Sequence, residues 1–378
     1  MVRSRATGRG PASVQAEVVT ELDRLEEFAP GWDALAVASN RPRSSPVLTL
    51  AWYRHAMPVG TKIRAVIVSD GDSVVGAAPF YVVRSSAGFY RYELAAPMLH
   101  GVEPLCAPGR DDEVWESMAV ALGNSDPAPD SVSLDWLLAD SSLPQAFRRG
   151  WPGRPPVLID GHTFVSPHVM IAGCDFEAWL RERSKNFRNS VRSDHRKLRA
   201  EGFEHRMSTE AADVIERLPQ QQRLYERRRA DRGGSGPPFD GRFLDMVSEA
   251  VERSETGRLR LSTFERPGEV IATDLIINAG MGSSSWIRGF DDAWANLSPG
   301  RANLALCVED SMLRGEEIFD LGPGVEPYKS SFTGDEATLQ GHLLVRRGLR
   351  PFHTPAQLLP YAARQAAGRF VGRLRHSE

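Results

Sequence analysis

The stretch from Ser283 to Gly322 reads SSSWIRGFDDAWANLSPGRANLALCVEDSMLRGEEIFDLG, and the order of its elements decides the fold. Its first part, SSSWIRGF, is typical of a strand, and a Pro-Gly pair at positions 299 and 300 then opens a predicted helix. The final segment, EIFDLG, predicts a short buried strand. Strand, helix and strand in this order predict a β–α–β crossover. The loop before its helix lies at a strand end, where open sheets bind phosphates.

Length and composition are those of an ordinary globular protein. The chain has 378 residues, enough for two domains, with 41% hydrophobic residues, 25% charged residues and a net charge of −3. With a net charge this close to zero, the surface as a whole is not expected to attract nucleic acid. Any basic patch therefore has to be local. The cysteines, at positions 106, 174 and 307, form no CxxC pair, which argues against a disulfide framework and a zinc site and fits a reducing cytoplasm.

The chain shows no run of about 18 apolar residues, so no membrane span is expected. Residues 1–14 begin with basic residues but have no apolar core behind them. They are therefore expected to form a disordered tail, not a signal peptide.

The two halves of the sequence show a similar order of predicted elements. The first half has helices at 15–35, 45–57 and 111–124, with strands at 62–70, 73–83, 89–97 and 131–138 between and after them. The second half has one long helix at 176–202, helices at 211–233, 240–257 and 298–316, three strands within 258–291 and further strands at 317–322 and 338–347.

One constant offset lays the halves over each other. GDSVVGAAPFYV begins at Gly71 and PGEVIATDLIIN begins at Pro267, so that Val75 aligns with Ile271. This similarity indicates duplication of one α+β unit, although two unrelated β-hairpins can also look alike. The predicted lobes are residues 15–148 and 166–350, with a Pro- and Gly-rich linker at 149–165 and a helical tail at 351–378.

The most unusual segment is a basic helix. Its cationic side chains recur every three or four residues and therefore share one face, and they include Lys185, Arg188, Arg192 and Arg196. This face could hold the phosphates of a cofactor or a nucleic-acid backbone. The alternative is a solvated face in which Glu182 and Asp194 are partial partners.

A second possible anion site is the start of the helix at 298–316. The backbone N–H groups from about Arg301 to Asn303 are expected to be free there. The sequence contains no HExxH, GxSxG, GxGxxG or P-loop motif, and no metal-binding set emerges. These absences argue against hydrolase, dehydrogenase and kinase functions.

Four motifs together resemble a known family. They are RxxxRxxxRxLRAEG in the basic helix, GEVIATDLII, GFDDAWANLSPGRANL and FDLGPGVEPYKSSF. This set is similar to the GNAT-fold acyltransferases of the CelD-like (cellulose-biosynthesis-associated) family, relatives of the Fem-type aminoacyltransferases that build peptidoglycan bridges. The resemblance covers roughly residues 20–350 and is clearest from 176 to 334.

The resemblance implies an α+β fold of tandem GNAT-like lobes, each a mixed, mostly antiparallel twisted sheet flanked by helices. It also implies that the second lobe binds the acyl donor, acetyl-CoA or another acyl-CoA, at Gly300, Arg301, Ala302 and Asn303. The usual loop R/QxxGxG/A is only partly present, because Gly300 is its one glycine. Aminoacyl-tRNA, the donor of the Fem-type relatives, therefore stays open as an alternative, and the basic helix suits an RNA backbone.

The resemblance further implies a catalytic group at the YK pair. Lys329 is expected beside the cleft between the lobes, where it could stabilise an oxyanion or hold a donor phosphate. Tyr328 could protonate the leaving group, and Glu326 or Asp291 could accept the proton of an attacking amine. No nucleophilic Cys or Ser stands in a base-paired motif, so direct transfer is expected.

The preferred interpretation is N-acyl transfer to a small-molecule amine or a polysaccharide precursor. One alternative is an aminoacyl-tRNA-dependent transferase of cell-wall or natural-product synthesis. The other is a non-catalytic accessory protein of an exopolysaccharide system.

Overall fold

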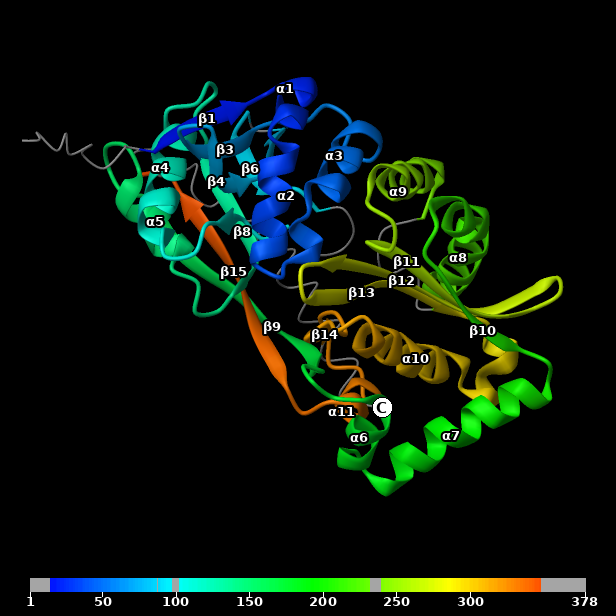
Figure 1. Cartoon of the computed structure of the whole chain (residues 1–378). Coiled ribbons are helices and arrows are strands. Elements are labelled where there is room, and N and C mark those ends of the chain that lie inside the picture. Colours follow the sequence, from blue (N-terminus) through cyan, green and yellow to red (C-terminus); the bar gives the residue numbers. More distant parts are fainter. Residues whose placement is uncertain (1–13, 87, 97–101, 232–238, 348–378) are drawn as a thin grey trace, which may run out of the picture.

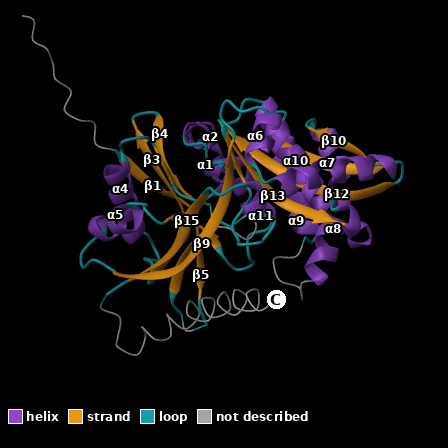
Figure 2. Cartoon of the chain, turned by 90° about the horizontal axis from the view of Figure 1, so that it is seen from below, coloured by secondary structure: helices purple, strands orange, loops and turns teal. Residues whose placement is uncertain are grey.

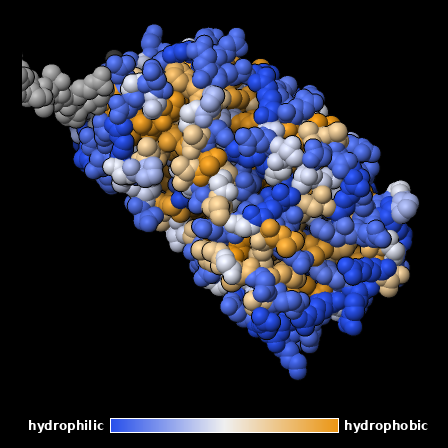
Figure 3. Space-filling view, viewed as in Figure 1, coloured by the Kyte–Doolittle hydropathy of each residue, from blue (hydrophilic) through white to orange (hydrophobic). Residues whose placement is uncertain are grey.

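The computed structural model of the chain describes residues 14–86, 88–96, 102–231 and 239–347. These residues form two lobes that make one elongated body (Figures 1 and 3). Twisted, mixed sheets flanked by helices run through both lobes, so the expected α+β class is confirmed. The two predicted tails lie outside the described residues, apart from Val14.

The first lobe carries an antiparallel sheet and the end of a larger mixed one. Its strands are β1 (Gln15–Val19), β2 (Lys62–Ile63), β3 (Ala65–Asp70), β4 (Ser73–Ala78), β5 (Phe80–Arg84), β6 (Tyr90–Leu94), β7 (Leu105–Cys106) and β8 (Ser131–Leu138). Its helices are α1 (Leu22–Glu27), α2 (Ala29–Ala38), the 3₁₀ helix η1 (Pro42–Ser44), α3 (Pro46–His55), α4 (Asp111–Gly123) and α5 (Leu143–Gly150).

The second lobe places helices on both faces of a sheet. Its strands are β10 (Glu204–Ser208), β11 (Leu259–Arg266), β12 (Glu269–Ala279), β13 (Gly282–Phe290) and β14 (Ile318–Asp320). Its helices are α6 (Phe176–Glu182), α7 (Lys185–Ala200), α8 (Ala211–Asp231), α9 (Gly241–Arg253), the 3₁₀ helix η2 (Asp292–Leu297), α10 (Pro299–Leu313) and α11 (Lys329–Phe332). Helices α8 and α9 cover one face, α10 covers the other, and α7 lies outside α10 (Figure 1).

Two strands belong to both lobes. β9 (Val157–Met170) pairs with β14 at one end and with β15 (Glu336–Val345) along its length, and β15 also pairs with β8. In the described residues this joins eleven strands in the order β10-β11-β12-β13-β14-β9-β15-β8-β6-β5-β2. Figure 2 shows the pair at the centre of the molecule. The prediction of a linker at 149–165 is therefore wrong, because much of this segment is the first part of β9.

The predicted repeat has a structural counterpart. The hairpin of β3 and β4 has a bulge opposite the step from Val68 to Ser69, and the extra residue is Val75. The hairpin of β11 and β12 has its bulge opposite the step from Phe264 to Glu265, and the extra residue is Ile271. Val75 and Ile271 are the residues that the sequence offset aligns. Each lobe also has a parallel strand pair joined through a helix, β6–α4–β8 and β13–α10–β14. Both observations support duplication.

A common hydrophobic core holds the lobes together. Trp52 and Tyr53 of α3 belong to the same buried cluster as Phe243, Met246 and Ala250 of α9. Side chains from the two lobes therefore exclude water jointly, and we expect the lobes to behave as one body.

Two other predicted elements differ from the structure. Residues 15–19 form β1, which pairs antiparallel with β3, and are not the start of a helix. The predicted long helix at 176–202 is two helices, because Arg183 adopts an extended backbone and Ser184 caps α7 by accepting a hydrogen bond from the Phe187 amide.

Candidate active site

The candidate site forms where two parallel strands diverge. β13 and β14 pair only from Gly282, opposite Ile318, to Ser284, opposite Asp320. β13 then continues to Phe290, whereas β14 has ended. A bulge in β13 at Trp286 increases the local twist, and the Arg288 guanidinium spans the gap by donating to the Leu321 carbonyl at 2.8 Å.

A pocket of about 280 Å³ opens beside this gap at the start of α10. Three arginines line it, and no described lining residue has a carboxylate; the lining is Arg228, Thr273, Arg288, Gly289, Phe290, Ala295, Ser298, Pro299, Gly300, Arg301, Asn303 and Tyr328. We call it the α10 pocket. Its charge and its place at a helix N-terminus favour an anionic ligand.

The first turn of α10 is held more tightly than the sequence predicts. Ser298, the N-cap residue, has a left-handed backbone (φ 51°), and its carbonyl accepts hydrogen bonds from the amides of Arg301 and Ala302, both at 3.1 Å. The expectation of free N–H groups at Arg301 and Ala302 is therefore wrong. The turn also sits close to β13, because a Cβ added to Gly300 would lie 3.0 Å from the Phe290 ring.

The side chains of this turn bind neighbouring elements. Arg301 donates to Asp194 of α7 at 2.6 and 2.8 Å, and Asn303 accepts from Ser262 of β11 at 2.8 Å. Asp194 therefore pairs with α10 and not with the basic face of its own helix. These contacts fix the end of α10 between α7 and the sheet.

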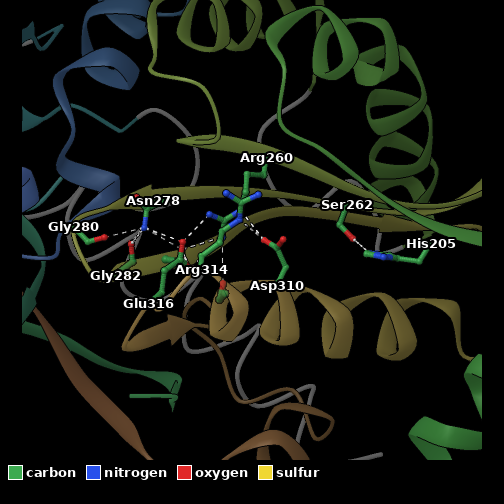
Figure 4. A network of polar contacts seen from close by, with 11 residues as sticks. His205, Arg260, Ser262, Asn278, Gly280, Gly282, Asp310, Arg314 and Glu316 are labelled. Atoms are coloured by element: carbon green, nitrogen blue, oxygen red, sulfur yellow. Dashed lines mark hydrogen bonds and ion pairs between the residues drawn. The ribbon is translucent and has the colours of Figure 1, made fainter. Parts of the chain in front are cut away.

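A buried polar network anchors the rest of α10 to the sheet (Figure 4). Arg260 of β11 is 1% exposed and binds Glu316 at 2.7 and 3.1 Å and Asp310 at 3.1 Å. The Asn278 amide donates to Glu316 and to the carbonyls of Gly280 and Gly282, which closes the hairpin of β12 and β13. The helix that bounds the α10 pocket is therefore fastened at both ends.

A carboxyl group lies in the middle of the sheet near the gap. Asp274 of β12 is fully buried, and Ser285 donates to its two oxygens at 2.7 and 2.9 Å. Burial raises the pKa of Asp274 to about 7, although Arg288 at 3.7 Å opposes this shift. The Arg288 guanidinium also lies 5.3 Å from the Tyr328 ring centroid, and burial raises the pKa of the Tyr328 hydroxyl. Tyr328 consequently stays protonated at neutral pH.

Lys329 lies inside the loop that follows β14. It is 3% exposed, and its ammonium donates to the carbonyls of Gly322 and Pro323 at 2.7 and 2.9 Å and pairs with Glu326 at 2.9 Å. Burial lowers the pKa of Lys329 to about 8, against the attraction of Glu326. Its three donors are thus used within the loop, and Tyr328, not Lys329, lines the α10 pocket.

The remaining predicted site residues do not line the α10 pocket. Asp291 accepts from the Ala293 amide as the N-cap of η2 and pairs with Arg227 at 2.8 Å. On α7, Arg188 donates to the carbonyls of Arg181 and Arg183, and Arg192 pairs with Glu177. Lys185 and Arg196 are exposed and make no side-chain hydrogen bond or ion pair within the described residues.

Four residues of the site were not predicted: Arg228, Asp274, Ser285 and Arg288. Asp274 carried a usable signal, because it interrupts the apolar run of GEVIATDLII, where a carboxyl group has to face a polar partner. Ser285 and Arg288 become its neighbours only through the register of β12 with β13.

A second cavity, of about 250 Å³, lies between the lobes. Its lining comes from η1 and its flanks, from β8, β9, β14 and β15, from the start of β13, and from Glu103 and Pro323; its Arg, Asp and Glu side chains are those of Arg41, Arg43, Glu103 and Asp320. We call it the interlobe cavity. In the described part of the chain, no set of three or more His, Cys, Asp or Glu side chains could hold a metal ion. No described helix is long and apolar enough to cross a membrane.

Solved structures of other proteins have a fold similar to that of this chain. A crystal structure of FemX matches with a TM-score of 0.62 at 10% identity, over 86% of this chain and 96% of that one. The C-terminal domain (DUF2156) of a protein assigned as a lysylphosphatidylglycerol synthetase from Agrobacterium fabrum matches with a TM-score of 0.55 at 8% identity, over 88% and 95%.

A conserved protein of unknown function from Bacteroides thetaiotaomicron matches with a TM-score of 0.54 at 10% identity, over 88% of this chain and 100% of that one. No curated protein matches the sequence. Likeness at such low identity shows the fold alone. The family model of the acetyltransferase (GNAT) domain matches residues 185–330. The segment that carries the α10 pocket is therefore similar in sequence to the GNAT acetyltransferase domain, within a chain of FemX-like fold.

Proposed function

We propose that the protein is an acyltransferase that moves an acyl group from acyl-CoA in the α10 pocket to an amine acceptor between the lobes. The observation that carries this proposal is a cationic pocket without a lining carboxylate, placed where two parallel strands diverge. An anionic donor fits there, with its phosphates near the start of α10 and its acyl arm directed into the gap.

A difference in charge between corresponding helices of the two lobes supports placing the donor in the α10 pocket. The first turn of α10 has no acidic residue, whereas the corresponding helix of the first lobe, α4, begins with Asp111, Asp112 and Glu113. Three carboxylates at a helix N-terminus repel phosphate. Of these two helix starts, that of α10 is therefore the one that suits an anionic donor.

Direct transfer then requires two proton movements. The amine nitrogen forms a bond to the acyl carbon, the carbon–sulfur bond breaks, and the leaving thiolate takes a proton from Tyr328. We assign to Arg288, which spans the gap, the stabilisation of the negative charge that develops during the attack. We assign Lys329 and Glu326 to positioning, because their contacts hold the loop that presents Tyr328.

One observation favours a second donor. The exposed side chains of α7 include Lys185, Arg192, Arg196, Lys197 and Arg199, and they form a basic edge where α7 lies at the bottom of Figures 1 and 3. A phosphate backbone could bind this edge. Aminoacyl-tRNA is therefore the alternative donor.

Ligand-dependent thermal unfolding tests the proposal. Acetyl-CoA or a longer acyl-CoA at 100 times its dissociation constant should stabilise the protein by about 2.7 kcal/mol, a shift of a few degrees. The variant Arg288→Ala should lose this shift, while Arg149→Ala, on the exposed surface of α5 in the first lobe, should keep it. If no acyl-CoA shifts the melting temperature but aminoacyl-tRNA does, the donor assignment moves to aminoacyl-tRNA.

A further inference from the structure

The floor of the interlobe cavity has an apolar end and a polar end. Residues opposite each other on neighbouring strands share one face of a sheet. Leu138 of β8, Leu339 of β15 and Phe164 of β9 are opposite one another and form an apolar row. Two residues further along β9, Ser166 lies opposite Ala337, and two further still, His168 lies opposite Asp320. The surface therefore changes from aliphatic to polar along β9.

A strained tryptophan is held at the apolar end. Trp136 lines the cavity, stacks on Phe164 with ring centroids 4.1 Å apart, and has a left-handed backbone (φ 67°). It lies in a bulge of β8 opposite Gly341, where β9 also bulges. Bulges and left-handed non-glycine residues are concentrated at functional sites. The double bulge thus turns a large aromatic ring onto the cavity floor.

The polar end offers one uncommitted group. The Asp320 carboxylate already accepts from Ser166, Ser284, the Gly322 amide and Arg43. The His168 imidazole beside it makes no side-chain hydrogen bond or ion pair within the described residues, and it lines the cavity. An imidazole nitrogen can therefore bind a polar group of a ligand there.

This polar end lies beside the place where β13 and β14 diverge. The pairing of β13 with β14 ends at Ser284 and Asp320, and Asp320 faces the cavity while Phe319 belongs to the core beneath α10. A ligand group beside His168 would thus approach the gap from the face opposite α10.

We propose that the interlobe cavity binds the acceptor as a small amine on a single apolar ring, with the ring against Trp136, Leu138 and Leu339 and the amino group beside His168. This inference rests on the acyl transfer proposed above and names its acceptor class. The cavity, of about 250 Å³, has room for such a ring. The apolar row favours an apolar ring over the hydroxyl-bearing ring of an amino sugar at that end of the cavity, while the charged side chains Arg41, Arg43 and Glu103 line the cavity elsewhere.

His168 then has a chemical role. As the amine nitrogen forms its bond to the acyl carbon, the neutral imidazole takes the proton that the nitrogen releases, and Tyr328 supplies the proton that the leaving sulfur gains. One bond forms and one breaks, and each proton has a named donor and acceptor.

Equilibrium binding of benzylamine and of glucosamine, measured with and without CoA, tests which class of amine the interlobe cavity binds. Benzylamine should bind at least tenfold more tightly than glucosamine. The variant Trp136→Gly should weaken benzylamine binding at least tenfold and leave the affinity for CoA unchanged, because glycine adopts the left-handed backbone without strain and only the ring is lost. Equal or tighter binding of glucosamine, or an unchanged benzylamine affinity in Trp136→Gly, would overturn the proposal.

Turnover tests the role of His168. We expect His168→Gln to lower kcat at least 100-fold with little change in KM. His162→Gln, on the same strand but outside the cavity lining, is the matched control and should keep the wild-type kcat. An unchanged kcat in His168→Gln contradicts the role. The outcomes are separable: if acyl-CoA binds and benzylamine does not, the acceptor class fails alone, and the reverse result removes the donor assignment alone.

Discussion

The protonation of Asp274, a residue of the candidate site, makes the free energy of unfolding depend on pH. Its carboxyl group is fully buried, which raises its folded-state pKa to about 7, whereas an unfolded Asp titrates near 3.9. As pH rises from about 4 to 7, the unfolded state releases this proton while the folded state keeps it, so the free energy of unfolding falls. The full effect is on the order of 4 kcal/mol.

We therefore expect Asp274→Asn to be more stable relative to the wild type at pH 8 than at pH 4.5, as measured by urea unfolding. Asp320→Asn provides a control of opposite sign. Burial acts to raise the pKa of Asp320, but Arg43 and its hydrogen bonds hold it below the usual value, so Asp320 adds stability at neutral pH that is lost on acidification. A difference between Asp274→Asn and the wild type that does not vary with pH would contradict the assignment.

Lys329 is expected to act on the loop and not on the reacting atoms. Lys329→Ala leaves Glu326 and the carbonyls of Gly322 and Pro323 without their cation. Breaking a buried pair costs about 3–5 kcal/mol, so thermal unfolding should show a large loss of stability together with a loss of activity. The neighbouring variant Ser330→Ala removes an exposed hydroxyl and should be nearly neutral. Full stability of Lys329→Ala with abolished turnover would instead indicate direct catalysis.

At the scale of elements, α10 depends on charges buried beneath it. Arg260→Ala leaves the carboxylates of Glu316 and Asp310 without their shared partner, and should cost several kcal/mol and weaken acyl-CoA binding by displacing the helix. The double variant Arg260→Met with Glu316→Gln removes most of the unpaired charge and should recover stability, as measured by denaturant unfolding. Additive losses in the double variant would show that the network does not act as a unit.

The outer face of α7 can be tested for its role separately. Reversing the charges of Lys185 and Arg196, which are exposed and without partners in the described residues, should leave stability and the KM for acyl-CoA unchanged. If aminoacyl-tRNA is the donor, the same variant should weaken its binding, and the salt dependence of binding should become less steep. Steady-state kinetics at several salt concentrations distinguish the two cases.

Sequence patterns predicted elements better than they predicted contacts. The helices α3 and α4 and the β13–α10–β14 crossover were predicted, because their periodicity and turn residues are local. β1 was missed because its five residues, QAEVV, gain their strand character from pairing with β3, about fifty positions away. The role assigned to Lys329 depended on its exposure, which the folding of residues 322–326 around it determines.

At the scale of the whole molecule, β9, β15 and the shared core make the two lobes one cooperative unit. We expect a single thermal transition by calorimetry, with equal calorimetric and van't Hoff enthalpies. Two resolved transitions would show that the lobes unfold independently. The core contacts of α3 with α9 give the same expectation, since neither lobe covers these side chains alone.

The placement of β15 also has a consequence for synthesis on the ribosome. The strand next to β8 in the first lobe is made of residues 336–345, although β8 itself ends at Leu138. While the intervening polypeptide is being translated, at about 5–20 residues per second, the edge of β8 lacks its final neighbour for some ten seconds or more. The nascent first lobe would then be a natural client for a chaperone that shields unpaired strands until the last strand arrives.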